Sequence, residues 1–226
     1  MALAATRDIR LICFDLDGTL IDNTIYIWST LHEHFGSDAS RRAKAAEDYR
    51  AGKTSYREWF LTDLELLRGC GADRAGMLEA FERLVPAPGA HETLAELGRR
   101  GYRLGLISGS LDLVLDHFFP RAPFAHVLIN KIEFDSQGRI SGGQHTAYDL
   151  GAKAAGLAEI AGREGISLAE CAFVGDNVND LEVMQAAGFS LGVNIKNERV
   201  AEAADVVVAG NDLRKVLEYF PGPVPS

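Results

Sequence analysis

The sequence predicts an α/β protein, a doubly wound parallel sheet with a small all-helical domain inserted after the first strand. From residue 86 onward, short apolar runs alternate with helix-length segments, a pattern typical of parallel βαβ units. Between residues 23 and 85 no strand-like alternation occurs, and apolar and aromatic residues recur at helical spacing. We therefore expect a core domain formed by residues 1–22 and 86–226 and a helical cap domain formed by residues 23–85.

The first strand ends in a pair of acids. An apolar run at residues 9–13 predicts a buried strand, and residues 14–20 continue it as Phe-Asp-Leu-Asp-Gly-Thr-Leu. Asp15 and Asp17 should emerge at the carboxyl end of this strand, where open α/β sheets bind ligands. Two carboxylates on one side of an extended segment repel each other unless a cation or a shared proton offsets the repulsion. An Asp-x-Asp tripeptide alone would equally fit a solvated turn.

The insert at residues 23–85 should consist of several helices with a hinge at each end. Its breaks are expected at residues 36–38, 51–54 and 69–71. Ser37 or Asp38 could cap the helix after the first break, and Thr54 or Ser55 the helix after the second.

Histidine and cysteine do not predict a metal site or a disulfide. His32 and His34 are two residues apart, so on a helix they face different directions, and a solvated or interhelical role is expected. Cys13, Cys70 and Cys171 are odd in number, widely spaced and free of a C-x-x-C pattern, which favours reduced, mostly buried thiols.

The core resumes at the Pro-Ala-Pro-Gly of residues 86–89 and continues with alternating elements. Helices are expected at 93–100, 111–119, 152–163, 180–187, 198–204 and 213–220, and strands at 102–107, 124–134, 172–174, 189–193 and 205–208. The turn after residue 134 predicts a hairpin and a small antiparallel excursion. Residues 221–226 form a Pro-rich tail for which no ordered structure is expected.

Two further stretches at strand ends could bind phosphate. Ser108-Gly109-Ser110 ends the second strand with a hydroxyl and a run of backbone amides beside a glycine, although Ser-Gly-Ser alone is also a common turn. Lys153 lies at the start of an Ala-rich helix, where it is either solvated or directed into a carboxylate cluster that would place phosphate between opposite charges.

The stretch Phe-Val-Gly-Asp-Asn-Val-Asn-Asp at residues 173–180 adds two more acids. Gly175 permits a tight turn, Asp176 lies at the strand tip, and Asp180 opens the next helix, where it could act as a cap. Together with Asp15 and Asp17 they form four clustered carboxylates, which cannot all stay ionised without a divalent cation. Hard oxygen ligands select Mg²⁺.

In order, these stretches resemble the signature motifs of the haloacid dehalogenase (HAD) superfamily and, in finer detail, its phosphoserine-phosphatase-like branch. The resemblance covers nearly the whole chain and implies a Rossmann-like core with a helical cap. It implies that Asp15 is a nucleophile that attacks phosphorus and that Asp17 is the general acid and base. The implied phosphate-binding residues are Asp15, Leu16, Asp17, Ser108, Gly109 and Lys153. The implied Mg²⁺ site consists of Asp15, the Asp17 carbonyl and Asp176, with Asp180 and Asn179 ordering its waters.

Composition limits the partners. The net charge of −9 disfavours nucleic acid or an anionic membrane as a partner. The first eight residues become charged too soon for a secretory signal, and no apolar run approaches the ~20 residues of a membrane span. The default expectation is a cytoplasmic monomer or homodimer that acts on a small-molecule phosphomonoester.

The expected function is Mg²⁺-dependent hydrolysis of a small phosphorylated metabolite through an aspartyl phosphate. A carbon–halogen hydrolase would not need Asp17 or the acids at residues 176–180, and a non-catalytic module would tolerate loss of a motif, yet none is lost. A phosphotransferase using the same aspartyl phosphate stays an alternative, as does a true phosphoserine phosphatase.

The two charged residues that recognise phosphoserine in this branch are not reproduced at the matching positions. In phosphoserine phosphatases a Glu nine residues after the nucleophile reads the substrate amino group, and an Arg in the cap reads its carboxylate. The matching positions here are Thr24 and, by the cap alignment, Leu61, with Arg57 one helical turn away. We therefore expect inefficient turnover of phosphoserine. The aromatic residues Tyr26, Trp28, Tyr56, Trp59 and Phe60 indicate either a more apolar pocket or the core of the cap.

Overall fold

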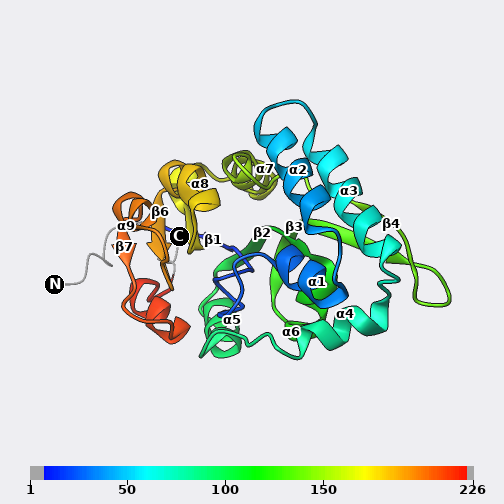
Figure 1. Cartoon of the computed structure of the whole chain (residues 1–226). Coiled ribbons are helices and arrows are strands. Elements are labelled where there is room, and N and C mark those ends of the chain that lie inside the picture. Colours follow the sequence, from blue (N-terminus) through cyan, green and yellow to red (C-terminus); the bar gives the residue numbers. More distant parts are fainter. Residues whose placement is uncertain (1–7, 223–226) are drawn as a thin grey trace.

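The computed structural model describes residues 8–222, and within this range seven strands form one sheet (Figure 1). The strands are β1 (Leu11–Phe14), β2 (Arg103–Leu111), β3 (Phe124–Phe134), β4 (Ile140–Gln144), β5 (Cys171–Gly175), β6 (Phe189–Gly192) and β7 (Val206–Val207). Their spatial order is β4-β3-β2-β1-β5-β6-β7. All neighbours are parallel except β3 and β4, which form the expected antiparallel hairpin. The predicted α/β architecture is confirmed.

The helices follow the predicted order. They are α1 (Ile27–Phe35), α2 (Ala39–Arg50), α3 (Tyr56–Gly69), α4 (Arg74–Phe81), α5 (Ala90–Arg99), α6 (Asp112–Phe118), α7 (Lys153–Glu164), α8 (Leu181–Ala186) and α9 (Glu198–Ala203), with short 3-10 helices η1 (Leu168–Glu170), η2 (Val178–Asp180) and η3 (Leu213–Tyr219). The final helix of the sequence prediction is thus a 3-10 helix, and η2 precedes α8. In the described part of the chain, no helix is long and apolar enough to cross a membrane.

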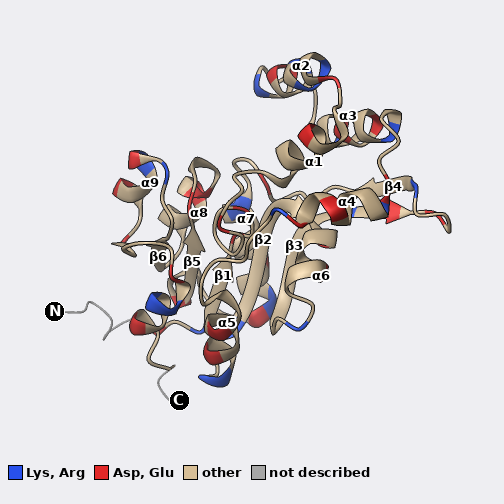
Figure 2. Ribbon diagram, turned by 60° about the horizontal axis from the view of Figure 1, so that its bottom comes forward, with Lys and Arg blue, Asp and Glu red and all other residues tan. Residues whose placement is uncertain are grey.

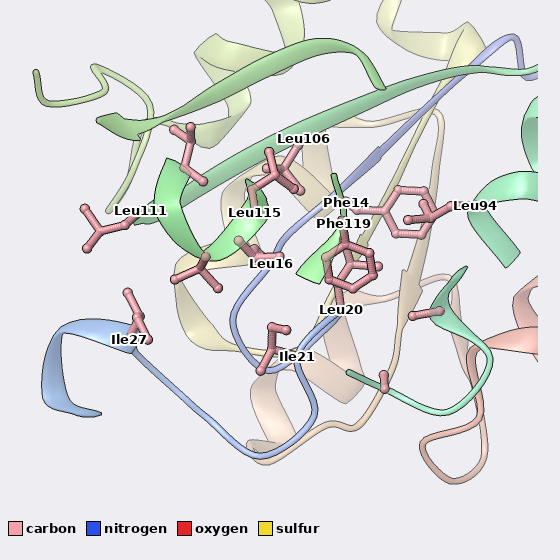
Figure 3. Packing of buried hydrophobic residues seen from close by; sticks show 14 of the residues in the cluster. Phe14, Leu16, Leu20, Ile21, Ile27, Leu94, Leu106, Leu111, Leu115 and Phe119 are labelled. Carbon is pink, nitrogen blue, oxygen red and sulfur yellow. The ribbon is translucent and has the colours of Figure 1, made fainter. Parts of the chain in front are cut away.

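Alternation along β1 builds two hydrophobic layers. Ile12 and Phe14 face the layer that contains α5, α6 and η3, whereas Leu11 and Cys13 face the layer that contains α7, α8 and α9. Figure 1 shows these helix groups on opposite sides of the sheet. Figure 3 shows the first layer, in which the Phe14 and Phe119 rings lie among leucines of β2, α5 and α6. Because both faces are covered, the strands are apolar throughout and only their ends are available for chemistry.

The insert at residues 23–85 is helical, as predicted. Asp38 caps α2 by accepting from the Arg41 amide, and Ser55 forms a capping box with Glu58 at the start of α3. Helix α2 stands farthest from the sheet and contacts α3 (Figure 2). The apolar side chains of α1, α3 and α4 form one continuous cluster with those of the layer that contains α5, α6 and η3.

Three details differ from the sequence prediction or lie outside the described residues. Strand β2 does not end at Ile107 but runs through Ser108 to Leu111, with a bulge against β3. A bulge re-aims side chains next to a site without breaking the strand. Cys70 is exposed, while the other two cysteines are buried and free as expected. Most of the N-terminal stretch and of the Pro-rich tail, residues 1–7 and 223–226, lies outside the described residues.

Candidate active site

Three carboxylates meet where β1 and β5 end. Asp15 follows β1 and Asp176 follows the adjacent parallel strand β5, while Asp180 lies in η2 directly after it. One carboxylate oxygen from each of the three lies within 4.8 Å of the others, and all three side chains are buried. The cluster contains these three carboxylates rather than the four expected, because the carboxylate of Asp17 is not part of it.

Two glycines make this close approach possible. A Cβ at Gly18, whose φ is +79°, would lie 2.1 Å from Asp176 Oδ2, and a Cβ at Gly175 would lie 2.4 Å from Asp180 Oδ2. Any larger residue would displace a carboxylate of the cluster. Asp180 does not cap the helix that follows. Instead its Oδ2 accepts from the amides of Asp176 and Asn177, at 3.0 and 3.2 Å.

Lys153 projects into the cluster, which is one of the two positions that the sequence allowed for it. Its side chain is fully buried, and its Nζ lies 2.6 Å from Asp15 Oδ2 and 2.7 Å from Asp180 Oδ1. Burial lowers the pKa of Lys153, but the two carboxylates outweigh this effect and the pKa is raised above its ordinary value. Lys153 therefore stays charged and neutralises part of the cluster.

One positive charge does not compensate all the carboxylates. Burial, with repulsion from Asp15 and Asp180, raises the pKa of Asp176 to about 8. Asp176 Oδ2 is buried and has no hydrogen-bond partner among the described residues. A buried carboxylate oxygen without a donor, beside two other carboxylates, is the environment that a divalent cation fits. The residues present thus fit a divalent metal ion.

Asp17 is held apart from the cluster by two donors. Its Oδ2 accepts from the Ile27 amide at the start of α1, and its Oδ1 accepts from the Ser110 hydroxyl of β2, both at 2.7 Å. Burial raises the pKa of Asp17 to about 7, although both hydrogen bonds oppose the shift. A carboxyl group with this pKa can both give and take a proton near neutral pH.

The predicted phosphate-binding residues lie around this centre. Ser108 is buried at the β2 bulge, and its Oγ accepts from the Ser110 amide at 3.2 Å. The Leu16 amide donates to Asp15 Oδ1 at 2.7 Å. Ser108 and Gly109 line the same cavity as Asp15 and Asp17. The structure therefore brings the β1 and β2 motifs together.

A family model described as haloacid dehalogenase-like hydrolase matches residues 9–188. The chain belongs to this family. It is 27% identical over 212 residues to a phosphoserine phosphatase of Methanocaldococcus jannaschii, which covers 93% of this chain and 97% of the relative. A phosphoserine phosphatase of Streptomyces coelicolor is 30% identical over 205 residues, 88% of this chain, but the chain spans only 47% of that relative's length.

Solved structures agree with the sequence relatives. A phospho-aspartyl intermediate analogue of phosphoserine phosphatase matches with a TM-score of 0.71 and 27% identity, covering 93% of this chain and 98% of that one. A substrate-bound phosphoserine phosphatase complex matches with a TM-score of 0.72 over the same shares. The predicted superfamily and its phosphoserine-phosphatase-like branch are thereby confirmed, and with them a phosphatase as the class of enzyme.

Sequence reasoning on this HAD phosphatase missed Asn130 and Asp149, and it named Tyr56 only as a residue of an apolar pocket or of the cap core. The Tyr56 hydroxyl donates to Asp149 Oδ2 at 2.8 Å and accepts from Asn130 Nδ2 at 3.0 Å. Asn130 also donates to the Gly109 carbonyl at 2.7 Å, and Trp28 Nε1 donates to the same carbonyl at 3.0 Å. These bonds fix the β2 bulge from both the sheet and the inserted helices. Two features of the sequence could have indicated them. Asn130 is a polar residue within the apolar run at 124–134, and Asp149 is an acid four residues before Lys153.

A cavity of about 770 Å³ leads from the acidic residues into the inserted helices. Asp15, Asp17 and the Ser108–Ser110 segment line one end, and side chains of α1, α2 and α3 line the other. His32, one of the two histidines of the sequence analysis, lies here and joins helices as expected: its Nε2 is 3.2 Å from Asp63 Oδ1 of α3. A bound substrate would therefore touch the core with one end and the inserted helices with the other.

Proposed function

We propose that this enzyme hydrolyses small phosphomonoesters through an aspartyl phosphate formed on Asp15, with Mg²⁺ as its metal. The observation that carries the proposal is the buried Asp15 carboxylate, which faces the cavity between Lys153 and the Asp176–Asp180 pair. When bound by Asp15, Asp176 and the Asp17 carbonyl, the metal would neutralise the oxygens of the transferring phosphoryl group. Three protein oxygens with waters in the remaining positions suit Mg²⁺. Asp180 and Asn179 would order these waters.

Asp15 would attack phosphorus in line with the ester oxygen. The bond between phosphorus and the alcohol oxygen breaks as the bond between Asp15 and phosphorus forms. Asp17 would give its proton to the leaving alcohol and later take a proton from the water that hydrolyses the aspartyl phosphate. The Ile27 amide and the Ser110 hydroxyl hold Asp17 in one orientation, and its pKa of about 7 is matched to both transfers.

The phosphoryl oxygens would be held by the Ser108 hydroxyl, the amides of Leu16, Asp17 and Gly109, and Lys153. Lys153 already contacts the nucleophile, so it would hold phosphate and Asp15 together while it offsets their repulsion. Positioning and charge neutralisation supply most of the catalysis in phosphoryl transfer.

The test of this proposal is Asp15→Asn. An amide is a poor nucleophile and a weaker metal ligand, so turnover of an aryl phosphate should fall by at least about a thousandfold. Beryllofluoride, which mimics the aspartyl phosphate, should raise the melting temperature of the wild type in the presence of Mg²⁺ and not that of the variant. Asp22→Asn is the matched control, because Asp22 bonds Asn211 and lies outside the cavity lining.

Retention of a tenth or more of wild-type activity by Asp15→Asn would contradict the proposal. Adding acceptor alcohols to the same assay separates hydrolysis from phosphotransfer. Hydrolysis is expected, so free phosphate should account for the phosphate released.

A further inference from the structure

We propose that the inserted helices form a chamber for a bulky, uncharged, ring-containing alcohol, so that the preferred substrates are phosphomonoesters of such alcohols rather than phosphoserine. The chamber is the part of the cavity lined by α1, α2 and α3. This inference rests on the proposed phosphatase function and adds the class of leaving group. A cavity of about 770 Å³ lies within the range of roughly 300–1,000 Å³ that binds drug-sized ligands, which is far more than serine needs.

Helix α2 lines the chamber with three alanines and with Arg42 and Arg50. Ala39, Ala43 and Ala46 line the chamber and follow one another at helical spacing, so they share a face. No residue of α2 is fully buried. An apolar ring placed against these alanines would give α2 the packing that the described residues do not provide.

A second part of the wall, from α1 and α3, is aromatic. Trp28 and Phe60 meet edge to face with ring centroids 5.7 Å apart, and Tyr56 and Trp59 do so at 6.1 Å. Trp28 also donates to the Gly109 carbonyl, so this wall begins beside the proposed phosphate site. Trp59 Nε1 is buried without an acceptor among the described residues. A ring attached to the ester oxygen would lie between aromatic residues and alanines.

The chamber holds a buried carboxylate with basic side chains nearby. Asp63 Oδ1 lies 3.7 Å from Arg42 Nε and 3.2 Å from His32 Nε2, although none of these three atoms has a hydrogen-bond partner among the described residues. Two exposed residues of opposite sign, Arg50 and Glu33, also line the cavity. A charged alcohol would lose its hydration there and would meet charged groups of both signs.

The positions that read phosphoserine in the branch do not do so here. Thr24 is buried, its hydroxyl lies 3.4 Å from that of Thr30, and it does not line the cavity. Leu61 packs against the hydrophobic cluster, and Arg57 is exposed outside the cavity lining. Asp149 lies beside Gly109, where an added Cβ would lie 2.0 Å from its Oδ2, and it already accepts from the Tyr56 hydroxyl.

The experiment compares kcat/KM for ethyl phosphate, naphthylmethyl phosphate and phosphoserine with Mg²⁺ present. The first two release alcohols of similar basicity, so their difference reports recognition of the ring. Naphthylmethyl phosphate should exceed both others by about a hundredfold. Ala43→Leu and Ala46→Leu fill the chamber, and each should lower kcat/KM for naphthylmethyl phosphate at least about tenfold while changing that for ethyl phosphate less than twofold.

Ala45→Leu is the matched control, because Ala45 lies on the same helix but lines a groove against α3 that shares only Trp59 with the chamber. It should leave both values within twofold. Three outcomes would overturn the inference while leaving the phosphatase proposal standing. The filling variants could lower kcat/KM for ethyl phosphate as much as that for naphthylmethyl phosphate, or they could change neither value. Phosphoserine could also be the best of the three substrates. Absence of turnover with every monoester would instead overturn the proposed function and this inference with it.

Discussion

Asp176 is the site carboxylate with the least compensation from its neighbours. Its side chain is buried, one oxygen has no donor among the described residues, and the Lys196 Nζ stands 3.9 Å away. The other oxygen accepts from the Thr19 hydroxyl at 3.1 Å. A residue held in this way opposes folding when it is ionised and favours metal binding for the same reason.

This balance predicts a pH-dependent stability. The pKa of Asp176 is raised from 3.8 to about 8, so the folded protein binds this proton more tightly than the unfolded chain. The resulting stability is complete below pH ~4 and is lost as the pH rises to about 8, with a slope of up to about 1.4 kcal/mol per pH unit. Asp176→Asn cannot ionise, so in metal-free protein it should be stabilised relative to wild type as the pH rises from 5 to 8.

Thermal unfolding in chelator at several pH values measures this difference. Mg²⁺ should raise the melting temperature of the wild type more at pH 8 than at pH 5.5, and this shift should be lost in Asp176→Asn. Asp116→Asn, an exposed acid on α6, should follow the wild type. Parallel pH curves for wild type and Asp176→Asn would refute the assignment of this carboxylate as the strained ligand.

Residues in motifs could be predicted, and residues that act through tertiary contacts could not. Asp15, Lys153 and Asp176 come together because parallel strands end at the same edge of the sheet. The position of Asp17 outside the cluster depends on two donors from distant segments, Ile27 and Ser110. Asn130 likewise becomes informative only once its contact with Gly109 is seen.

At the scale of elements, the start of α3 connects helix capping to the substrate chamber. The Ser55 Oγ accepts from the Glu58 amide at 3.2 Å, and Glu58 Oε2 accepts from the Ser55 amide at 2.7 Å. Tyr56 and Trp59 follow within the first turn, so this capping box fixes where two chamber side chains begin. The sequence left the cap open between Thr54 and Ser55, and the structure assigns it to Ser55.

Ser55→Ala should therefore have two effects. Loss of the cap should lower the free energy of unfolding by about 0.5–2 kcal/mol. The disordered first turn should also lower kcat/KM for bulky phosphomonoesters severalfold. Ser167→Ala removes a similar capping box, with Glu170 at η1, away from the cavity lining. Ser167→Ala should lower the free energy of unfolding without changing kcat/KM, and denaturant unfolding and steady-state kinetics measure the two quantities. Equal changes in kcat/KM for Ser55→Ala and Ser167→Ala would contradict a link between the capping of α3 and substrate recognition.

The β2 bulge shows what element prediction from local sequence cannot provide. Ser-Gly-Ser has the composition of a turn, yet residues 108–110 continue β2, and Asn130 and Trp28 donate to the Gly109 carbonyl. Local propensity is overridden here by side-chain hydrogen bonds from residues far along the chain.

At the scale of the whole molecule, the chain crosses twice between the core and the inserted helices, and the crossings are joined. The Asp22 amide donates to the Val85 carbonyl, and the Ala87 amide donates to the Leu20 carbonyl. Asn23 links them through its side chain, with Nδ2 donating to the Arg83 carbonyl at 2.7 Å and Oδ1 accepting from the Val85 amide at 2.8 Å. We propose that residues 23–85 are a cap domain that moves on residues 1–22 and 86–226 about this double crossing.

The proposed cap contacts the core at a second place, which would limit that motion. Arg68 Nε donates to the Ile140 carbonyl at 3.1 Å, and the Arg74 amide donates to the Gly138 carbonyl at 2.8 Å, so the end of α3 and the start of α4 rest on the β3–β4 hairpin. The Tyr56–Asp149 bond closes the opposite side over the site. Opening to admit substrate should therefore break the Tyr56 contact first and turn α1 and α2 about the crossings.

Asn23→Ala tests the joined crossings. Removing two side-chain hydrogen bonds of about 1 kcal/mol each should speed hydrogen exchange of the Asp22 and Val85 amides by about thirtyfold. Amides of β1 and β5 should keep their protection, because they belong to the sheet. Asn211→Ala is the control, since Asn211 bonds the Asp22 side chain without linking the two crossings. Unchanged exchange at Asp22 and Val85 would mean that the crossings are held independently of Asn23, whereas faster exchange throughout β1 would mean that the cap and the core open as one unit.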